Sequence, residues 1–131
     1  MEILNKLLNT NLLPLAFIGD SVHTLFVRKY CLSITSEKME NYHIKASKYC
    51  KASSQAKVLN LLQNQLSDEE KEIVRRGRNA KAKHQAKNAT SADYAHATAF
   101  EVLIGYLYLS KKEERLNKIL NLSISLLESE N

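Results

Sequence analysis

Helical spacing of apolar side chains runs through almost the whole chain and limits the possible folds more than any other feature. Apolar residues recur every three or four positions, the period of an α-helix that packs on one face. The 131 residues include three glycines and one proline, too few turn formers for a fold of many short strands. The sequence therefore predicts an all-α fold of about seven helices in a single compact domain, residues 1–131.

Polar segments with helix-start signals separate the expected helices. Asn11 is a good N-cap for the second helix, and Ser67 with Glu70 has the spacing of a capping box before the fifth. Ser36 and Ser91 are the expected caps of the third and sixth helices. The expected helices are 2–9, 12–33, 37–49, 51–64, 68–79, 92–110 and 112–127, with a basic loop over 80–90.

Composition favours a soluble chain in a reducing compartment. The longest stretch that is poor in charge, residues 7–27, still contains asparagine, proline, glycine and aspartate, so we expect no membrane-spanning helix. The N-terminus lacks the basic and apolar segments of a secretory signal. Two cysteines, Cys31 and Cys50, are too few for a disulfide framework. We therefore expect free thiols and a cytoplasmic location.

Positive charge is concentrated in one short segment, residues 75–87. It contains six basic residues and no acidic one, whereas the rest of the chain has a slight excess of acid. The net charge of +5 therefore comes from this segment. Such a concentration is typical of a surface that binds a polyanion, although a solvated basic loop is the ordinary alternative.

Two carboxylates stand alone in very apolar helices. Asp20 is the only formally charged residue of 7–27, and Glu101 is the only one of 94–110. We expect helices this apolar to form the core, where a carboxylate is costly unless it is hydrogen-bonded, paired or bound to a cation. Gly19 lies beside Asp20, and Gly105 lies one turn after Glu101. Because glycine weakens a helix, its presence favours a close approach of the two backbones.

These two acids are the candidate metal ligands. If Asp20 and Glu101 face each other, their oxygen atoms suit Mg²⁺ or Mn²⁺. The alternative, which the pattern leaves open, is two acids at helix edges, each satisfied by solvent or a distant base. His23 lies one turn after Asp20, and we expect it to be a core or interface residue because nitrogen is a poor match for Mg²⁺.

Three stretches of the chain resemble the ribonuclease III family. AFIGDSVHTLFVRKY, around Asp20, resembles the Gly-Asp-Ser signature helix, and ATAFEVLIGYLYL, around Glu101, resembles the second metal-binding helix. VRRGRNAK followed by AKNA, placed before that helix, resembles the Mini-ribonuclease III branch, which lacks a double-stranded-RNA-binding domain. The resemblance extends from about Leu12 to Leu120.

The resemblance implies a ribonuclease III fold, a homodimer and magnesium-dependent cleavage of double-stranded RNA. Mn²⁺ is the expected substitute ion, because oxygen ligands suit it as well. For the Mini branch it implies maturation of the ends of precursor 23S ribosomal RNA in ribosomal particles. By position, Asp20 and Glu101 match the family's catalytic, metal-binding acids. Thr98, Ala16 and Leu13 stand where longer members carry further acids, which leaves the number of metal ions open.

The basic segment is the expected RNA contact, because phosphates attract Lys and Arg and A-form RNA is recognised mainly by shape. Asn79 and Gln55 are candidate contacts to 2′-hydroxyl groups. The candidate RNA-binding residues of the segment are Arg75, Arg76, Arg78, Asn79, Lys81, Lys83 and Lys87. Two other functions remain open: a non-catalytic RNA-binding module of the same fold, and a helical adaptor that binds an acidic protein through residues 75–87.

Overall fold

The structure, a computed structural model, describes residues 2–34, 38–80 and 91–129. Over these residues the chain is all-α, as predicted, and contains no strand. None of the described helices is long and apolar enough to cross a membrane. The helices are α1 (Glu2–Asn9), α2 (Leu13–Ile34), α3 (Met39–Cys50), α4 (Ala52–Leu62), α5 (Asp68–Asn79), α6 (Ser91–Leu109) and α7 (Glu113–Ser129), and a 3-10 turn, η1 (Gln63–Gln65), follows α4.

Local hydrogen bonds confirm two of the predicted helix starts. The Asn11 side chain accepts from the backbone N–H of Leu13 at 3.0 Å, at the start of α2. Ser67 and Glu70 form the predicted capping box, in which each side chain accepts from the backbone N–H of the other residue. The third helix begins later than predicted: α3 starts at Met39, its N-cap is Lys38, and Ser36 lies outside the described residues.

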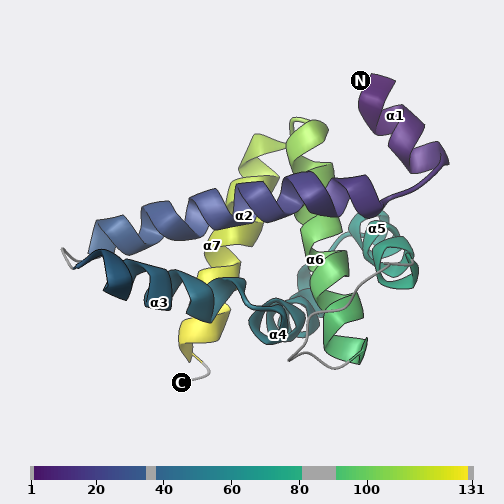
Figure 1. Cartoon of the computed structure of the whole chain (residues 1–131). Coiled ribbons are helices and arrows are strands. Elements are labelled where there is room, and N and C mark those ends of the chain that lie inside the picture. The colour runs from purple at the N-terminus through teal and green to yellow at the C-terminus, as the bar shows by residue number, and fades with distance from the viewer. Residues whose placement is uncertain (1, 35–37, 81–90, 130–131) are drawn as a thin grey trace.

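Helix α6 is the centre of the molecule. It packs against α2, α4, α5 and α7, and α2 crosses it on one side with α3 running alongside α2 (Figure 1). Phe100, Leu103, Ile104 and Leu107 of α6 are completely buried. The prediction that the sixth helix belongs to the core is therefore confirmed.

The same prediction for the second helix is wrong for one of its faces. Leu15 and Val27 are buried, but Phe17, Leu25 and Leu32 are 83%, 62% and 65% exposed. Because α2 lies across the outside of the bundle, only one of its sides has other described helices to pack against (Figure 1). We call the exposed residues Phe17, Leu25 and Leu32 the α2 stripe.

Helices α2 and α6 touch backbone to backbone, as the two glycines led us to expect. A Cβ atom added to Gly19 would lie 1.8 Å from the backbone oxygen of Glu101. One added to Gly105 would lie 2.0 Å from the backbone oxygen of Leu15. No other residue type allows this approach, and the contact places the two lone acids at the crossing.

Candidate active site

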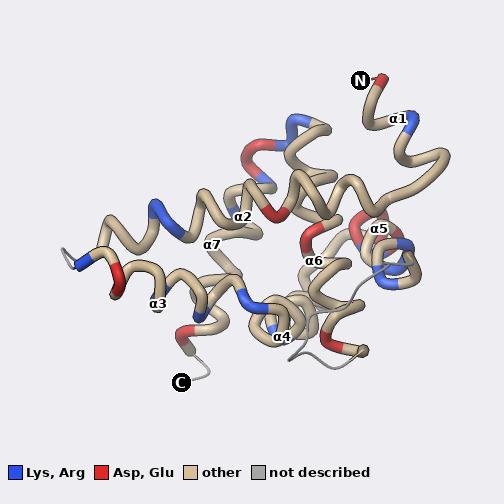
Figure 2. The backbone as a smooth tube through the Cα atoms, viewed as in Figure 1, with Lys and Arg blue, Asp and Glu red and all other residues tan. Residues whose placement is uncertain are grey.

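Asp20 and Glu101 line the same pocket, where α2 crosses α6. Figure 2 shows the acidic segment of α2 beside an acidic segment of α6 at this crossing. The pocket has a volume of about 390 Å³, and residues of α2, α4 and α6 together with Cys50 at the end of α3 line it. Asp20 is exposed, whereas Glu101 is half-buried. The fold therefore brings together the two acids, whose catalytic and metal-binding roles stay predictions.

The three positions at which the resemblance implies further acids in longer family members also line this pocket. They are occupied here by Leu13, Ala16 and Thr98, two apolar side chains and a hydroxyl. Within the described ranges no group of three or more His, Cys, Asp and Glu side chains is placed to hold a metal. The acidic part of the described site therefore consists of two carboxylates.

The electrostatics of the pair favour a bound cation. Burial, followed by the hydrogen bond to Asp20 and the charge of Asp20, raises the pKa of Glu101 to about 9. A hydrogen bond from Gln55 acts in the opposite direction. In the absence of metal, Glu101 therefore holds its proton at neutral pH. A divalent cation bound to the Glu101 oxygens would favour the ionised form instead.

Two buried polar side chains lie behind Glu101. His23 is 2% exposed and meets the Phe100 ring edge-on, with the ring centroids 5.0 Å apart. Burial lowers the pKa of His23 to about 4, although the charge of Asp20 acts to raise it. His23 is thus neutral at physiological pH, and its predicted position in the core is confirmed.

The sequence analysis did not predict the buried position of Gln55. It is 3% exposed, and its side-chain nitrogen lies 3.1 Å from His23 Nδ1 and 3.5 Å from Glu101 Oε2. The expected contact of Gln55 with a 2′-hydroxyl is therefore wrong, because its amide is occupied inside the protein. No signal in the sequence separates Gln55 from the other glutamines of the chain.

The three arginines of the basic segment have different surroundings at the end of α5. Arg75 is exposed and makes two hydrogen bonds with Glu72, at 2.7 and 2.8 Å. Arg76 is half-buried and donates to the backbone oxygen of Leu8 at 2.6 Å, which ties α1 to α5. Arg78 is exposed. The structure therefore gives Arg76 a contact that holds the fold, besides any role in binding.

The rest of the predicted RNA contact is only partly described. Asn79, the last residue of α5, is exposed. Lys81, Lys83 and Lys87 lie outside the described residues. The RNA-binding assignment of the segment stays a prediction.

Comparison with known proteins gives consistent matches. The family description "Ribonuclease III domain" matches residues 13–112. Mini-ribonuclease 3 of Brevibacillus brevis is 47% identical over 121 residues, which cover 92% of this chain and 90% of that protein. Mini-ribonuclease 3 of Staphylococcus aureus is 43% identical, covering 92% and 90%. A crystal structure of a Fusobacterium nucleatum protein is 34% identical with a TM-score of 0.80, covering 88% of this chain and 93% of that one.

The helical fold, the acid pair and these matches define the class of protein as an all-helical ribonuclease. The chain belongs to the ribonuclease III family, and its relatives place it in the Mini-ribonuclease 3 branch.

Proposed function

We propose that the chain is a magnesium-dependent endoribonuclease that cleaves double-stranded RNA and matures the ends of precursor 23S ribosomal RNA in the cytoplasm. The observation that carries the proposal is the meeting of Asp20 and Glu101 in one open pocket. Family membership supports the ribonuclease chemistry.

The residues of the pocket fit Mg²⁺. Both acids offer oxygen atoms, which Mg²⁺ prefers, and with two carboxylates the remaining positions would fall to water and phosphate oxygens. When bound, Mg²⁺ would neutralise charge on the scissile phosphate and make an attacking water more acidic. Glu101 would release its proton as the ion binds, because its pKa is raised in the metal-free site. Asp20, which is exposed, would hold the ion from the solvent side.

The end of α5 is the proposed RNA contact. Arg75, Arg78 and Asn79 are exposed there, and Lys81, Lys83 and Lys87 follow in the sequence. Contacts of this kind bind the phosphate backbone and carry no sequence information. They suit a duplex that is recognised by its A-form shape.

A homodimer is part of the proposal. The α2 stripe is a row of exposed apolar side chains on a helix that otherwise packs into the bundle. Such a row is typical of a surface that another protein chain covers. Two copies joined through α2 would carry two acid pairs, one for each strand of a duplex.

Cleavage of a long RNA duplex by the full chain tests the function. Wild-type protein with Mg²⁺ is expected to give discrete products, whereas EDTA or Glu101→Ala is expected to abolish them. Glu114→Gln, an exposed acid on α7, is the matched control and should cleave normally. Single-stranded RNA of the same sequence should remain intact.

Two results would contradict the proposal in different ways. Salt-sensitive duplex binding without cleavage would identify a non-catalytic RNA-binding module. No duplex binding at all would favour an adaptor that binds an acidic protein. Precursor 23S RNA, both free and in ribosomal particles, then tests the substrate: failure to shorten its ends in either form contradicts the 23S assignment alone.

A further inference from the structure

A buried amide and a buried imidazole lie behind Glu101, outside the acid pair itself. Gln55 comes from α4 and His23 from α2, and the side chains are 3% and 2% exposed. Groups this deep have lost contact with water, so their hydrogen bonds must come from protein atoms. In the described part of the chain, no buried side-chain nitrogen or oxygen lacks a hydrogen-bond partner.

The Gln55 nitrogen contacts both neighbours at once. It lies 3.1 Å from His23 Nδ1 and 3.5 Å from Glu101 Oε2. An amide nitrogen only donates and carries two hydrogens, so it can serve two acceptors. His23 Nδ1 is then an acceptor, and the ring proton of the neutral imidazole is on Nε2.

This arrangement selects one orientation of the amide. Glu101 bound to a metal ion would be ionised and could only accept hydrogen bonds. If the Gln55 amide turned over, its carbonyl oxygen would then face an acceptor at Glu101, and buried polar atoms would lose their partners. An ionised Glu101 therefore requires the Gln55 amide to present its nitrogen, and His23 Nδ1 supports this orientation by accepting the second hydrogen.

We propose that His23 and Gln55 form a positioning pair that orients the Glu101 carboxylate for metal binding. The proposal rests on the metal site proposed above. Gln55 holds Oε2 from the protein side, so the rest of the carboxylate is directed toward Asp20 and the pocket. Asp20 is exposed to solvent, whereas Gln55 holds Glu101 from inside the protein. Glu101 is therefore the acid of the pair whose orientation is set before a metal binds.

A positioning role and a merely structural role predict different results. Groups that orient a metal ligand commonly change metal affinity by 10–100-fold when they are removed. A pair that only satisfies its own buried hydrogen bonds would change stability and leave metal affinity as it was. Metal affinity measured without RNA therefore separates the two roles.

The first test uses the unaltered full chain with Mg²⁺ added, so that a bound ion would keep Glu101 ionised. Long-range ¹H–¹⁵N NMR spectra report which ring nitrogen of His23 carries the proton. We expect the proton on Nε2, with Nδ1 free to accept from Gln55. A proton on Nδ1 would overturn the proposal, because the His23 N–H and the Gln55 nitrogen would then be two donors facing each other.

The second test is Mn²⁺ binding by the full chain, followed by electron paramagnetic resonance. Gln55→Met keeps the approximate size but removes the donor, and we expect Mn²⁺ affinity to fall about 10–100-fold. Ser54→Ala is the matched control, because Ser54 is the buried neighbour of Gln55 on α4 and donates to the Lys48 backbone oxygen instead. It should lower stability and keep the wild-type Mn²⁺ affinity.

His23→Leu provides an independent variant if Gln55→Met fails to fold. It leaves the amide in place but removes the acceptor that orients it, so Mn²⁺ affinity should again fall. A folded Gln55→Met or His23→Leu with wild-type affinity would overturn the positioning role.

Glu101→Gln separates this failure from failure of the proposed function. If Glu101→Gln binds Mn²⁺ as tightly as the wild type, the metal site is wrong, and the positioning role is wrong with it. If only Glu101→Gln loses Mn²⁺, the metal site stands and the positioning role alone is overturned.

Discussion

Gly19 of α2 lies directly against the backbone of Glu101 in α6, where a Cβ atom would come within 1.8 Å of the Glu101 carbonyl oxygen. The next residue of α2 is Asp20, so the point of closest contact between the two helices is also the point that places the two acids together. The reciprocal contact, of Gly105 with Leu15, lies one helical turn away. The two glycines therefore set the separation of the carboxylates.

A side chain at Gly19 should separate these helices. We expect Gly19→Ala to lower the free energy of unfolding by about 3 kcal/mol or more, since a backbone atom cannot move aside as a side chain can. Urea denaturation measures the loss. Gly77→Ala is the control, because its Cβ would approach Ala99 and Val102 at 3.1 Å and should cost less. Wild-type stability of Gly19→Ala would contradict the contact.

The raised pKa of Glu101 predicts how the stability of the metal-free protein depends on pH. Folding moves this pKa from 4.5 to about 9. Between these values the folded protein holds a proton on Glu101 that the unfolded chain has released. The contribution of Glu101 to the free energy of unfolding is therefore full below pH 4.5 and is lost as pH rises through 9. In EDTA, the Tm should therefore fall over this range, and Mg²⁺ should offset the fall.

Calorimetry of wild type and Glu101→Gln across pH tests this. The difference between the two proteins isolates Glu101, because the lowered pKa of His23 gives an opposite trend between pH 4 and 6.5. Glu101→Gln should have the flatter profile above pH 6.5. Parallel profiles for the two proteins would show that Glu101 ionises normally in the fold.

Arg78 and Arg76 should respond differently to replacement. Arg78 is exposed, so Arg78→Ala should weaken duplex RNA binding and reduce the slope of log affinity against log salt by about 1. Arg76 donates to the Leu8 backbone, so Arg76→Ala should mainly loosen α1 and lower the Tm. Binding titrations at several salt concentrations measure the slope. An unchanged slope for Arg78→Ala would remove Arg78 from the RNA contact.

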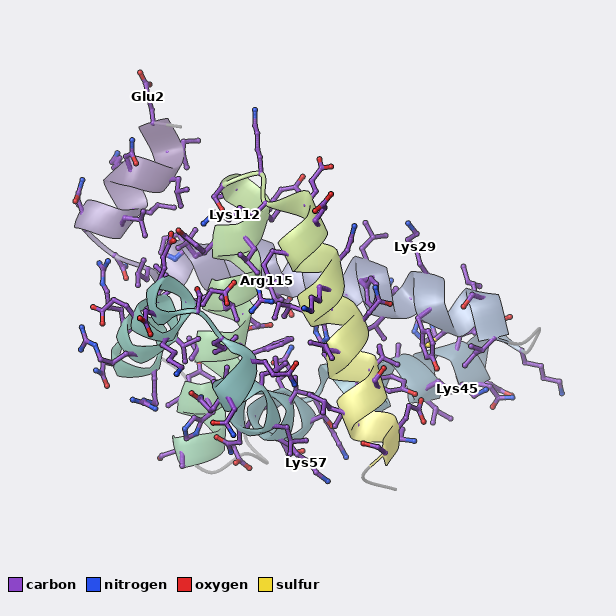
Figure 3. The ribbon with its side chains drawn as sticks, turned by 180° about the vertical axis from the view of Figure 1, so that it is seen from behind. Glu2, Lys29, Lys45, Lys57, Lys112 and Arg115 are labelled. Atoms are coloured by element: carbon purple, nitrogen blue, oxygen red, sulfur yellow. The ribbon has the colours of Figure 1, made fainter. Side chains whose placement is uncertain are left out.

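Arg115 should be a major stabilising residue of the C-terminal helix. It reaches from α7 (Figure 3) and makes hydrogen bonds of 2.7 Å to both carboxylate oxygens of Glu70, which is 5% exposed, and to the Gln65 backbone oxygen. Arg115→Met leaves the Glu70 carboxylate without its main partner and should cost about 1–3 kcal/mol.

A second substitution tests that reason. The hydrogen bonds from Arg115 are the largest of several effects that lower the pKa of Glu70. They therefore stabilise the folded protein fully above pH 4.5, and this stabilisation is lost as pH falls further. Adding Glu70→Gln to Arg115→Met removes the buried charge and keeps a residue type suited to the capping box. The double variant should regain part of the loss in urea denaturation. No recovery would show that the charge is not the cause.

The α2 stripe should control the oligomeric state. Leu25→Asp places a charge in the proposed contact between two copies, and sedimentation equilibrium is expected to show monomers where the wild type forms dimers. Ile3→Asp is the control, because Ile3 of α1 is 63% exposed and apolar but lies outside the stripe. A monomeric wild type, or a dimeric Leu25→Asp, would contradict this interface.

The sequence by itself determined the helices and the unusual character of the two acids. Helix periods, the capping box of Ser67 and Glu70, and the isolation of Asp20 and Glu101 in apolar runs are local properties that neighbouring residues display. The two glycines carried further information, because a helix tolerates glycine at a cost that close packing explains. The fold class and the meeting of α2 with α6 were therefore predictable.

Only the tertiary structure decided which faces meet. It left the α2 stripe uncovered, turned Arg76 toward α1, and brought Gln55 beside His23, a residue 32 positions away. Hydrophobic spacing indicates that a helix has a buried face, but the hydrophobic effect has no direction and does not choose the partner. The hydrogen bonds of Gln55 are short-range and directional, so they become visible only when three helices are in place.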